Sequence, residues 1–96
     1  MQFQREIDAL LQGSAVSFRP VGNSMTPRIK SKQLVTVSPD ITNIQVNDIV
    51  LCKVRGNILV HLVSAIQGDR YQISNNHGHV NGWTTKIYGV VINVSD

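Results

Sequence analysis

The spacing of apolar residues changes from helical to alternating after Ala15. The first apolar residues recur at helical intervals: Phe3, Ile7, Leu10 and Leu11. Gly13 follows them, and glycine commonly ends a helix because it adopts the left-handed conformation without strain. We therefore predict a short amphipathic helix over residues 2–12, whose apolar side packs against the rest of the domain.

From Val16 onward, short runs rich in β-branched residues alternate with turn signals, a pattern typical of antiparallel sheets. The predicted strands cover residues 16–20, 34–37, 48–55, 58–66, 71–74 and 87–94. Arg55-Gly56-Asn57 lies between two of these runs. Residues 48–55 and 58–66 are therefore expected to pair as a hairpin.

Two further segments are assigned from their polar residues. Three basic residues alternate with uncharged ones over residues 28–32, which predicts an extended segment with its positive charges on a solvated side. Residues 75–85 contain two histidines, three asparagines, two glycines and Trp83. That composition predicts a loop.

Length and composition fit one folded domain with a modest core. The chain has 96 residues, of which 42% are hydrophobic and 16% are charged, and this balance excludes a disordered chain. We predict a single, mainly β domain over residues 1–96, antiparallel, with the helix at 2–12 and a β core at 16–94.

Charge, apolar runs and cysteine content indicate which partners and which compartment to expect. The net charge of +3 and the isoelectric point of about 9.4 are too weak to indicate nucleic-acid binding, and no nucleic-acid partner is expected. No apolar run approaches the ~18 residues that a membrane span needs, and residues 1–6 lack the apolar region of a signal peptide. The single cysteine, Cys52, excludes an internal disulfide and fits a reducing compartment. These features predict a soluble cytoplasmic protein.

The stretch Val21-Gly22-Asn23-Ser24-Met25-Thr26-Pro27 is the first candidate for chemistry. Gly22 can take a positive φ, and Pro27 disfavours a helical conformation at the residue before it. A tight turn there would present Ser24 and neighbouring backbone N–H groups. Such a turn is equally typical of an ordinary surface loop.

A serine becomes a nucleophile only when a base within hydrogen-bond reach takes its proton. His61 lies in the most apolar predicted strand, where alternation places it on one face with Leu59 and Val63. Ile58, Val60 and Leu62 are expected on the opposite face. Burial among apolar neighbours keeps an imidazole neutral, as a general base requires. The alternative interpretation is a core histidine whose nitrogens are hydrogen-bonded.

Other residues offer competing chemistry. Lys53 could be a base, although a solvated lysine is the simpler interpretation. His77 and His79, with His61 or Cys52, could hold a metal ion, but two lone histidines specify such a site weakly, so no metal is expected. Cys52 alternates with valines and is expected to be buried. Trp83 is expected in the core, with the lining of a cleft as the alternative.

The order of these segments resembles that of the signal peptidase I and LexA-like serine peptidases. The matching elements are Gly22-Asn23-Ser24-Met25-Thr26-Pro27, Val46-Asn47-Asp48-Ile49-Val50, Leu59-Val60-His61-Leu62-Val63, Gly68-Asp69 and a late Asn-rich loop. The likeness extends from about Phe18 to Val94, and the Ser-Met-x-Pro element is its most specific part. The resemblance implies a small coiled β-ribbon or partly open antiparallel barrel with a short N-terminal helix.

The same resemblance implies a serine endopeptidase without a cofactor, acting on a protein or peptide. Ser24 would be the nucleophile and His61 its base, as in the histidine type of that superfamily, and the Ser24 backbone N–H would contribute to an oxyanion hole. The remaining expected site residues fall into two groups. Asn23, Asn75 and Asn81 are assigned to the oxyanion hole or to orienting the histidine, and Gly22, Met25 and Pro27 to the substrate cleft.

The chain departs from the family pattern where the histidine should be oriented. Asn75 and Asn81 stand where aspartates are expected, Asn47 replaces the glycine before Asp48, and Leu62 replaces the arginine that often follows the base. An asparagine can hydrogen-bond an imidazole but stabilises the imidazolium less than a carboxylate does. The alternative function is therefore a catalytically inactive binding, dimerisation or assembly module on the same fold, expected to form a homo-oligomer. The minimal size fits a phage-encoded protein acting in a bacterial or phage-infected host.

Overall fold

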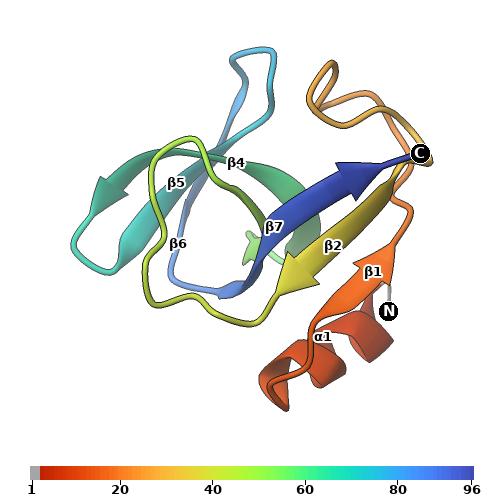
Figure 1. Ribbon diagram of the computed structural model, residues 1–96. Coiled ribbons are helices and arrows are strands. Elements are labelled where there is room, and N and C mark those ends of the chain that lie inside the picture. Colours follow the sequence, from red (N-terminus) through yellow and green to blue (C-terminus); the bar gives the residue numbers. More distant parts are fainter. Residues whose placement is uncertain (1–2) are drawn as a thin grey trace.

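One short helix and seven strands make up the computed structural model, which describes residues 3–96 (Figure 1). The elements are α1 (Gln4–Leu11), β1 (Val16–Phe18), β2 (Leu34–Ser38), β3 (Ile49–Val54), β4 (Asn57–Gln67), β5 (Arg70–Ser74), β6 (Val80–Thr84) and β7 (Ile87–Ser95). No helix in residues 3–96 is long and apolar enough to cross a membrane.

All seven strands belong to one antiparallel sheet that does not close into a barrel. The strand order is β1-β2-β7-β3-β4-β5-β6, so the last strand of the chain lies between β2 and β3. The sheet curls until β6 returns to the end of β3, where the Thr84 hydroxyl donates a hydrogen bond to the Lys53 carbonyl at 2.6 Å. The prediction of a mainly β, partly open antiparallel fold with an N-terminal helix is confirmed.

The predicted hairpin is formed by β3 and β4. Val54 pairs with Asn57 across a two-residue turn, in which Arg55 and Gly56 have φ values of 51° and 83°. Two positive φ values in succession give the turn whose twist matches that of the flanking strands. The turn therefore sets the register that places His61 opposite Val50.

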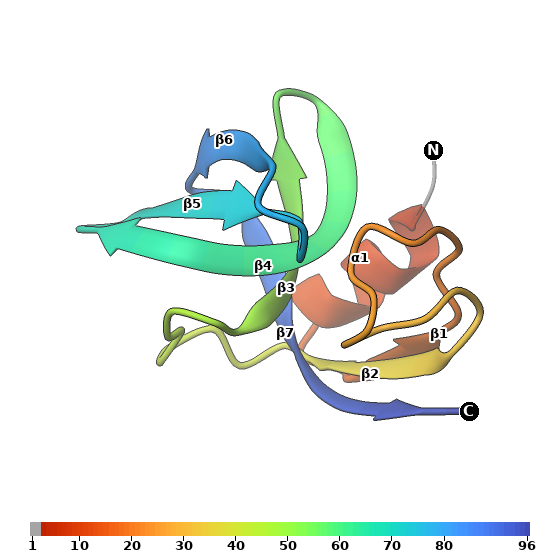
Figure 2. The ribbon, with the colours of Figure 1, turned by 90° about the horizontal axis from the view of Figure 1, so that it is seen from above.

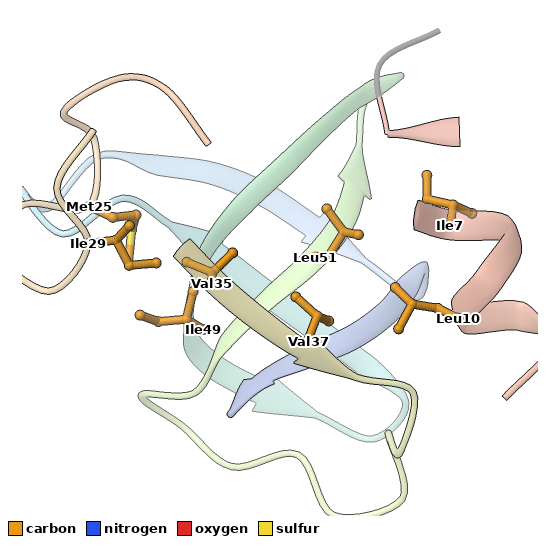
Figure 3. Packing of buried hydrophobic residues seen from close by; sticks show 8 residues of the cluster. All are labelled: Ile7, Leu10, Met25, Ile29, Val35, Val37, Ile49 and Leu51. Atoms are coloured by element: carbon orange, nitrogen blue, oxygen red, sulfur yellow. The ribbon is translucent and has the colours of Figure 1, made fainter. Parts of the chain in front are cut away.

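Two apolar clusters lie on opposite faces of β4, as its alternation predicts. One cluster includes Ile58, Val60 and Leu62, and the other includes Leu59 and Val63. Figure 3 shows the first cluster: Met25 and Ile29 lie beside Val35 and Ile49, whereas Ile7 and Leu10 of α1 approach Val37 and Leu51. The turn that carries Ser24 and the helix are thus both anchored in this cluster.

The helix is shorter than predicted within the described residues. It begins at Gln4 and ends at Leu11, and Gly13 follows with a φ of 92°. The predicted first residue, Gln2, lies outside the described residues.

The extended segment predicted over residues 28–32 is wrong. These residues form turns, and the Ile29 N–H donates to the Met25 carbonyl at 2.9 Å. Ile29 is buried in the first cluster, and burying it folds the chain back on itself. Burial of the Ile29 side chain therefore favours a turn here, although the alternating charges favour an extended segment.

The loop predicted over residues 75–85 is also partly wrong. Val80–Thr84 forms β6, which pairs with β5 along Tyr71–Ser74. Trp83 lies on this strand with 39% of its surface exposed, so the expectation of a core tryptophan is wrong as well. Asn81 and Gly82, which disfavour strands, are held in β6 because β5 supplies the pairing.

Candidate active site

Ser24 lies on an exposed turn between β1 and β2. Gly22 enters the turn with a φ of 114° and donates its N–H to Ser31 Oγ at 3.0 Å. Met25 and Ile29 are buried, so the apolar residues of the turn point inward and the serine points outward. A glycine before the serine and a buried methionine after it thus explain how the sequence presents this hydroxyl.

The segment between β5 and β6 holds this turn in place from outside. The Asn76 N–H donates to the Ser24 carbonyl at 2.8 Å, and Asn76 Nδ2 donates to the Thr26 carbonyl at 3.0 Å. His77 Nε2 lies 3.0 Å from the Asn23 carbonyl, which can only accept, so this nitrogen carries the proton. We call residues 75–79 the clamp loop.

His61 faces Ser24 from β4. Its Nε2 lies 3.0 Å from Ser24 Oγ, and its Nδ1 lies 2.7 Å from Asn81 Oδ1 on β6. Because Oδ1 can only accept, Nδ1 carries the proton and the lone pair of Nε2 is directed at the serine hydroxyl. The geometry is that of a nucleophile, a base and a group that orients the base.

The environment of His61 favours the neutral ring. The side chain is only 8% exposed, and burial lowers the pKa of His61, with the nearby His79 acting in the same direction. The hydrogen bond to Asn81 opposes these effects and raises the pKa, but burial is the larger cause. The ring is therefore available as a proton acceptor at neutral pH.

Ser24 and His61 line a cleft with a volume of about 440 Å³. The other lining residues come from the N-terminal segment and the first half of β4: Phe3, Glu6, Arg19, Pro20, Val21, Ile58, Leu59 and Val60. The cleft therefore combines a polar corner at the Ser24–His61 pair with an apolar wall from β4.

The structure separates the other expected site residues into two groups. Asn81 contacts His61, but Asn75 does not: its Oδ1 accepts the backbone N–H groups of His77 and His79 and shapes the clamp loop. Asn23 adjoins Ser24, and its carbonyl accepts from the Thr26 N–H as well as from His77.

The three residues expected in the substrate cleft do not line it. Met25 is buried in the first cluster with 3% of its surface exposed, because the turn closes over an apolar side chain. Gly22 and Pro27 are exposed on the turn but lie away from the cleft walls.

Reasoning from the sequence missed the contribution of Asn76 and His77. Their signal was the unusual density of asparagine and histidine in a short segment. The composition predicts a loop but does not indicate that this loop contacts the turn with Ser24. It also missed the apolar wall of the cleft, although the uninterrupted run of apolar residues at 58–60 marks that wall.

The competing chemistry has little support in the geometry. Burial raises the pKa of the Cys52 thiol to about 12, which makes it a poor nucleophile. Within residues 3–96 no group of three or more His, Cys, Asp or Glu side chains could hold a metal ion. His77 and His61 direct their ring nitrogens at the turn and at Asn81 instead.

Comparison with known proteins identifies the family. Residues 3–92 match the family model described as Peptidase S24-like. The match covers nearly the whole chain, and the chain belongs to this family, which lies within the LexA and signal peptidase-like superfamily. No curated protein and no solved structure matches the chain.

Proposed function

We propose that this member of the Peptidase S24-like family is a serine endopeptidase in which Ser24 is the nucleophile and His61 the general base. The observation that carries the proposal is the pair of short contacts at His61, 3.0 Å to Ser24 Oγ and 2.7 Å to Asn81 Oδ1. Family membership supports a peptidase-like protein, and the geometry supports these residues as its machinery.

The reaction follows from the direction of each proton. His61 Nε2 takes the hydroxyl proton as Ser24 Oγ attacks the carbonyl carbon of a peptide bond. His61 then gives this proton to the leaving amine, which departs as the C–N bond breaks and leaves an acyl-enzyme. A water molecule gives a proton to His61 as its oxygen attacks the acyl carbon; the bond from that carbon to Ser24 Oγ then breaks, and His61 returns the proton to Oγ, which releases the acid product.

Two groups assist these steps. Asn81 Oδ1 accepts a hydrogen bond from the Nδ1–H of His61 throughout, so Asn81 fixes the tautomer and orientation of the ring. The Ser24 backbone N–H has no acceptor within residues 3–96 and is placed to donate to the oxyanion of the tetrahedral intermediate.

The substrate lies extended along an open edge of β4. β5 pairs with β4 only from Leu62 onward, so on that edge residues 57–61 have no strand partner within residues 3–96. Because Asn57 closes the hairpin turn opposite Val54, Ile58 and Val60 direct their backbone N–H and C=O groups toward the open edge. Both residues line the cleft, so an added peptide strand would run beside Ser24.

A covalent probe tests the nucleophile directly. A fluorophosphonate should label the protein at Ser24, and Ser24→Ala should abolish both labelling and cleavage of a peptide library. Ser14→Ala is the matched control, because Ser14 is exposed and lies outside the cleft. Equal labelling of the two variants would refute the proposal.

The second candidate is a catalytically inactive binding or assembly module. The observation that favours it is Asn81 in place of a carboxylate opposite His61, since an amide stabilises the imidazolium less. This function predicts a folded protein with no reaction at Ser24 and an oligomer detected by light scattering.

A further inference from the structure

A second hollow, with a volume of about 360 Å³, lies where the β3–β4 turn meets β6. We call it the cationic hollow. Its lining residues are Lys53, Arg55, Gly56, Arg70, Trp83, Thr84, Thr85 and Lys86. Four of the nine lysines and arginines of the chain line it, and no acidic residue does. A concentration of positive charge in one hollow favours an anionic occupant.

The two arginines of the cationic hollow lie against β6, and Arg70 is held in place by its neighbours. Arg70 lies over the Trp83 ring at 5.4 Å from the ring centroid and donates to Gln67 Oε1 at 2.6 Å. Arg55 crosses the backbone of β6 at Gly82, where a Cβ would lie 3.3 Å from Arg55 Nε. Guanidinium groups that are already positioned lose less rotamer entropy when they bind a carboxylate in two-pronged geometry.

The cationic hollow adjoins the candidate active site through the hairpin. Gly56 lines the cationic hollow and Ile58 lines the cleft, and two strand residues span only about 7 Å. Figure 2 shows the tip of this hairpin between β6 on one side and α1 on the other. A peptide that runs along the open edge of β4 toward the turn would thus reach the cationic hollow.

We infer that the cationic hollow binds an acidic segment of polypeptide, rich in Asp or Glu, that continues from the peptide in the cleft. The inference rests on the proposed function for the identity of that polypeptide as a substrate. A single-stranded nucleic acid fits less well. Arg70 covers one face of Trp83, which reduces the aromatic surface on which a base could stack.

The experiment measures binding without catalysis. Fluorescein-labelled hexaglutamate is titrated with the Ser24→Ala protein and followed by fluorescence anisotropy, with hexaglutamine and a six-nucleotide oligothymidine as comparison probes. The double variant Arg55→Gln/Arg70→Gln is made in the same background. The matched control, Arg5→Gln/Arg28→Gln, removes the same charge from exposed residues outside the cationic hollow.

We expect hexaglutamate to bind better than either comparison probe. Its affinity should fall about tenfold in the Arg55→Gln/Arg70→Gln variant and change little in the control. Equal losses in the two variants, or tighter binding of the oligothymidine, would overturn the inference. This binding assay uses the Ser24→Ala protein, so its outcome is independent of fluorophosphonate labelling of the unsubstituted protein. If Ser24 is labelled but hexaglutamate does not bind, the proposed peptidase stands and the acidic-segment site is refuted.

Discussion

The two halves of the candidate active site are held in different ways. Ser24 lies on an exposed turn outside any strand, and polar contacts from the clamp loop fix its backbone. His61 lies within β4, and Val63 and Ile73 of the second cluster are fully buried nearby on the same sheet. Besides the buried Met25 and Ile29, the turn with the nucleophile therefore depends on hydrogen bonds from the clamp loop, whereas the strand with the base depends on the core.

This difference predicts how each half fails. Hydrogen bonds at the surface contribute modestly to the free energy of unfolding, so damage to the clamp loop should reduce activity more than stability. Core packing contributes several kcal/mol at a single residue, so damage beside His61 should reduce stability first. The following changes test the contrast, beginning with the largest expected effect.

Removing the base has the largest effect on activity. His61→Ala should lower kcat/KM about 10³-fold, because no other group takes the Ser24 proton, while circular dichroism still shows a folded protein. Asn93→Ala is the control, since Asn93 is exposed on β7 and lies outside the cleft. Comparable losses from the two variants would contradict the role of His61.

Removing core packing on the histidine side affects stability. Ile73→Ala should lower the free energy of unfolding by about 3 kcal/mol, because the side chain is fully buried and its removal leaves a cavity. Urea denaturation measures the change. The exposed Ile92, substituted in the same way, should cost less than about 0.5 kcal/mol. A similar cost at both positions would remove the distinction between the two halves.

A carboxylate in place of the Asn81 amide should increase activity through the histidine side of the site. Asn81→Asp should raise the pKa of His61 and increase kcat about tenfold, because the carboxylate stabilises the imidazolium that forms in the reaction. NMR titration of His61 and steady-state kinetics measure the two effects. Asn93→Asp adds the same charge at an exposed position of β7 and should leave both quantities unchanged.

Weakening the clamp loop tests the serine side. Asn76→Ala removes the bond from Nδ2 to the Thr26 carbonyl, and should lower kcat about fivefold through loss of orientation at Ser24. The stability cost should be only about 1 kcal/mol. The exposed Asn93→Ala is the matched control. A large loss of stability without a change in kcat would show that the clamp loop supports the fold rather than the nucleophile.

The smallest effect is the shape of the pH profile. The lowered pKa of His61 means that the ring stays neutral below the pH at which an ordinary histidine is protonated. The midpoint of the acidic fall in cleavage should therefore lie below the ordinary histidine value of ~6.5. The unfolded chain binds the proton more readily, so stability should also fall as the pH decreases through this range. A midpoint above the ordinary histidine value would contradict this environment for His61.

Features that depend on neighbouring residues could be predicted from the sequence. The β3–β4 hairpin follows from one turn signal, and the two faces of β4 follow from alternation over residues 58–63. The turn signal makes Ser24 a candidate and the apolar strand makes His61 one, but only the resemblance to a known family joins the two as a pair. Their spacing along the chain, 37 residues, carries no such information.

Features that depend on distant contacts could not be predicted. β6 contains Asn81 and Gly82, which disfavour strands, and it forms because β5 offers its edge. Asn76 contacts Thr26 across a sequence separation of 50 residues, so neither segment alone predicts which residue of the other it contacts. The same limit explains Asn75 and Asn81, which looked equivalent in sequence although only Asn81 lies on the strand that faces His61.

The central place of β7 has a consequence for biosynthesis. The β1–β2 ladder borders the turn with Ser24, the β3–β4 ladder carries His61, and the two ladders are joined in the sheet only through β7. A ribosome must therefore release residues 87–95 before the sheet can be completed, and until then the two ladders are not joined within the sheet. The Ser24–His61 contact is therefore expected to form late, after β7 has joined the two ladders.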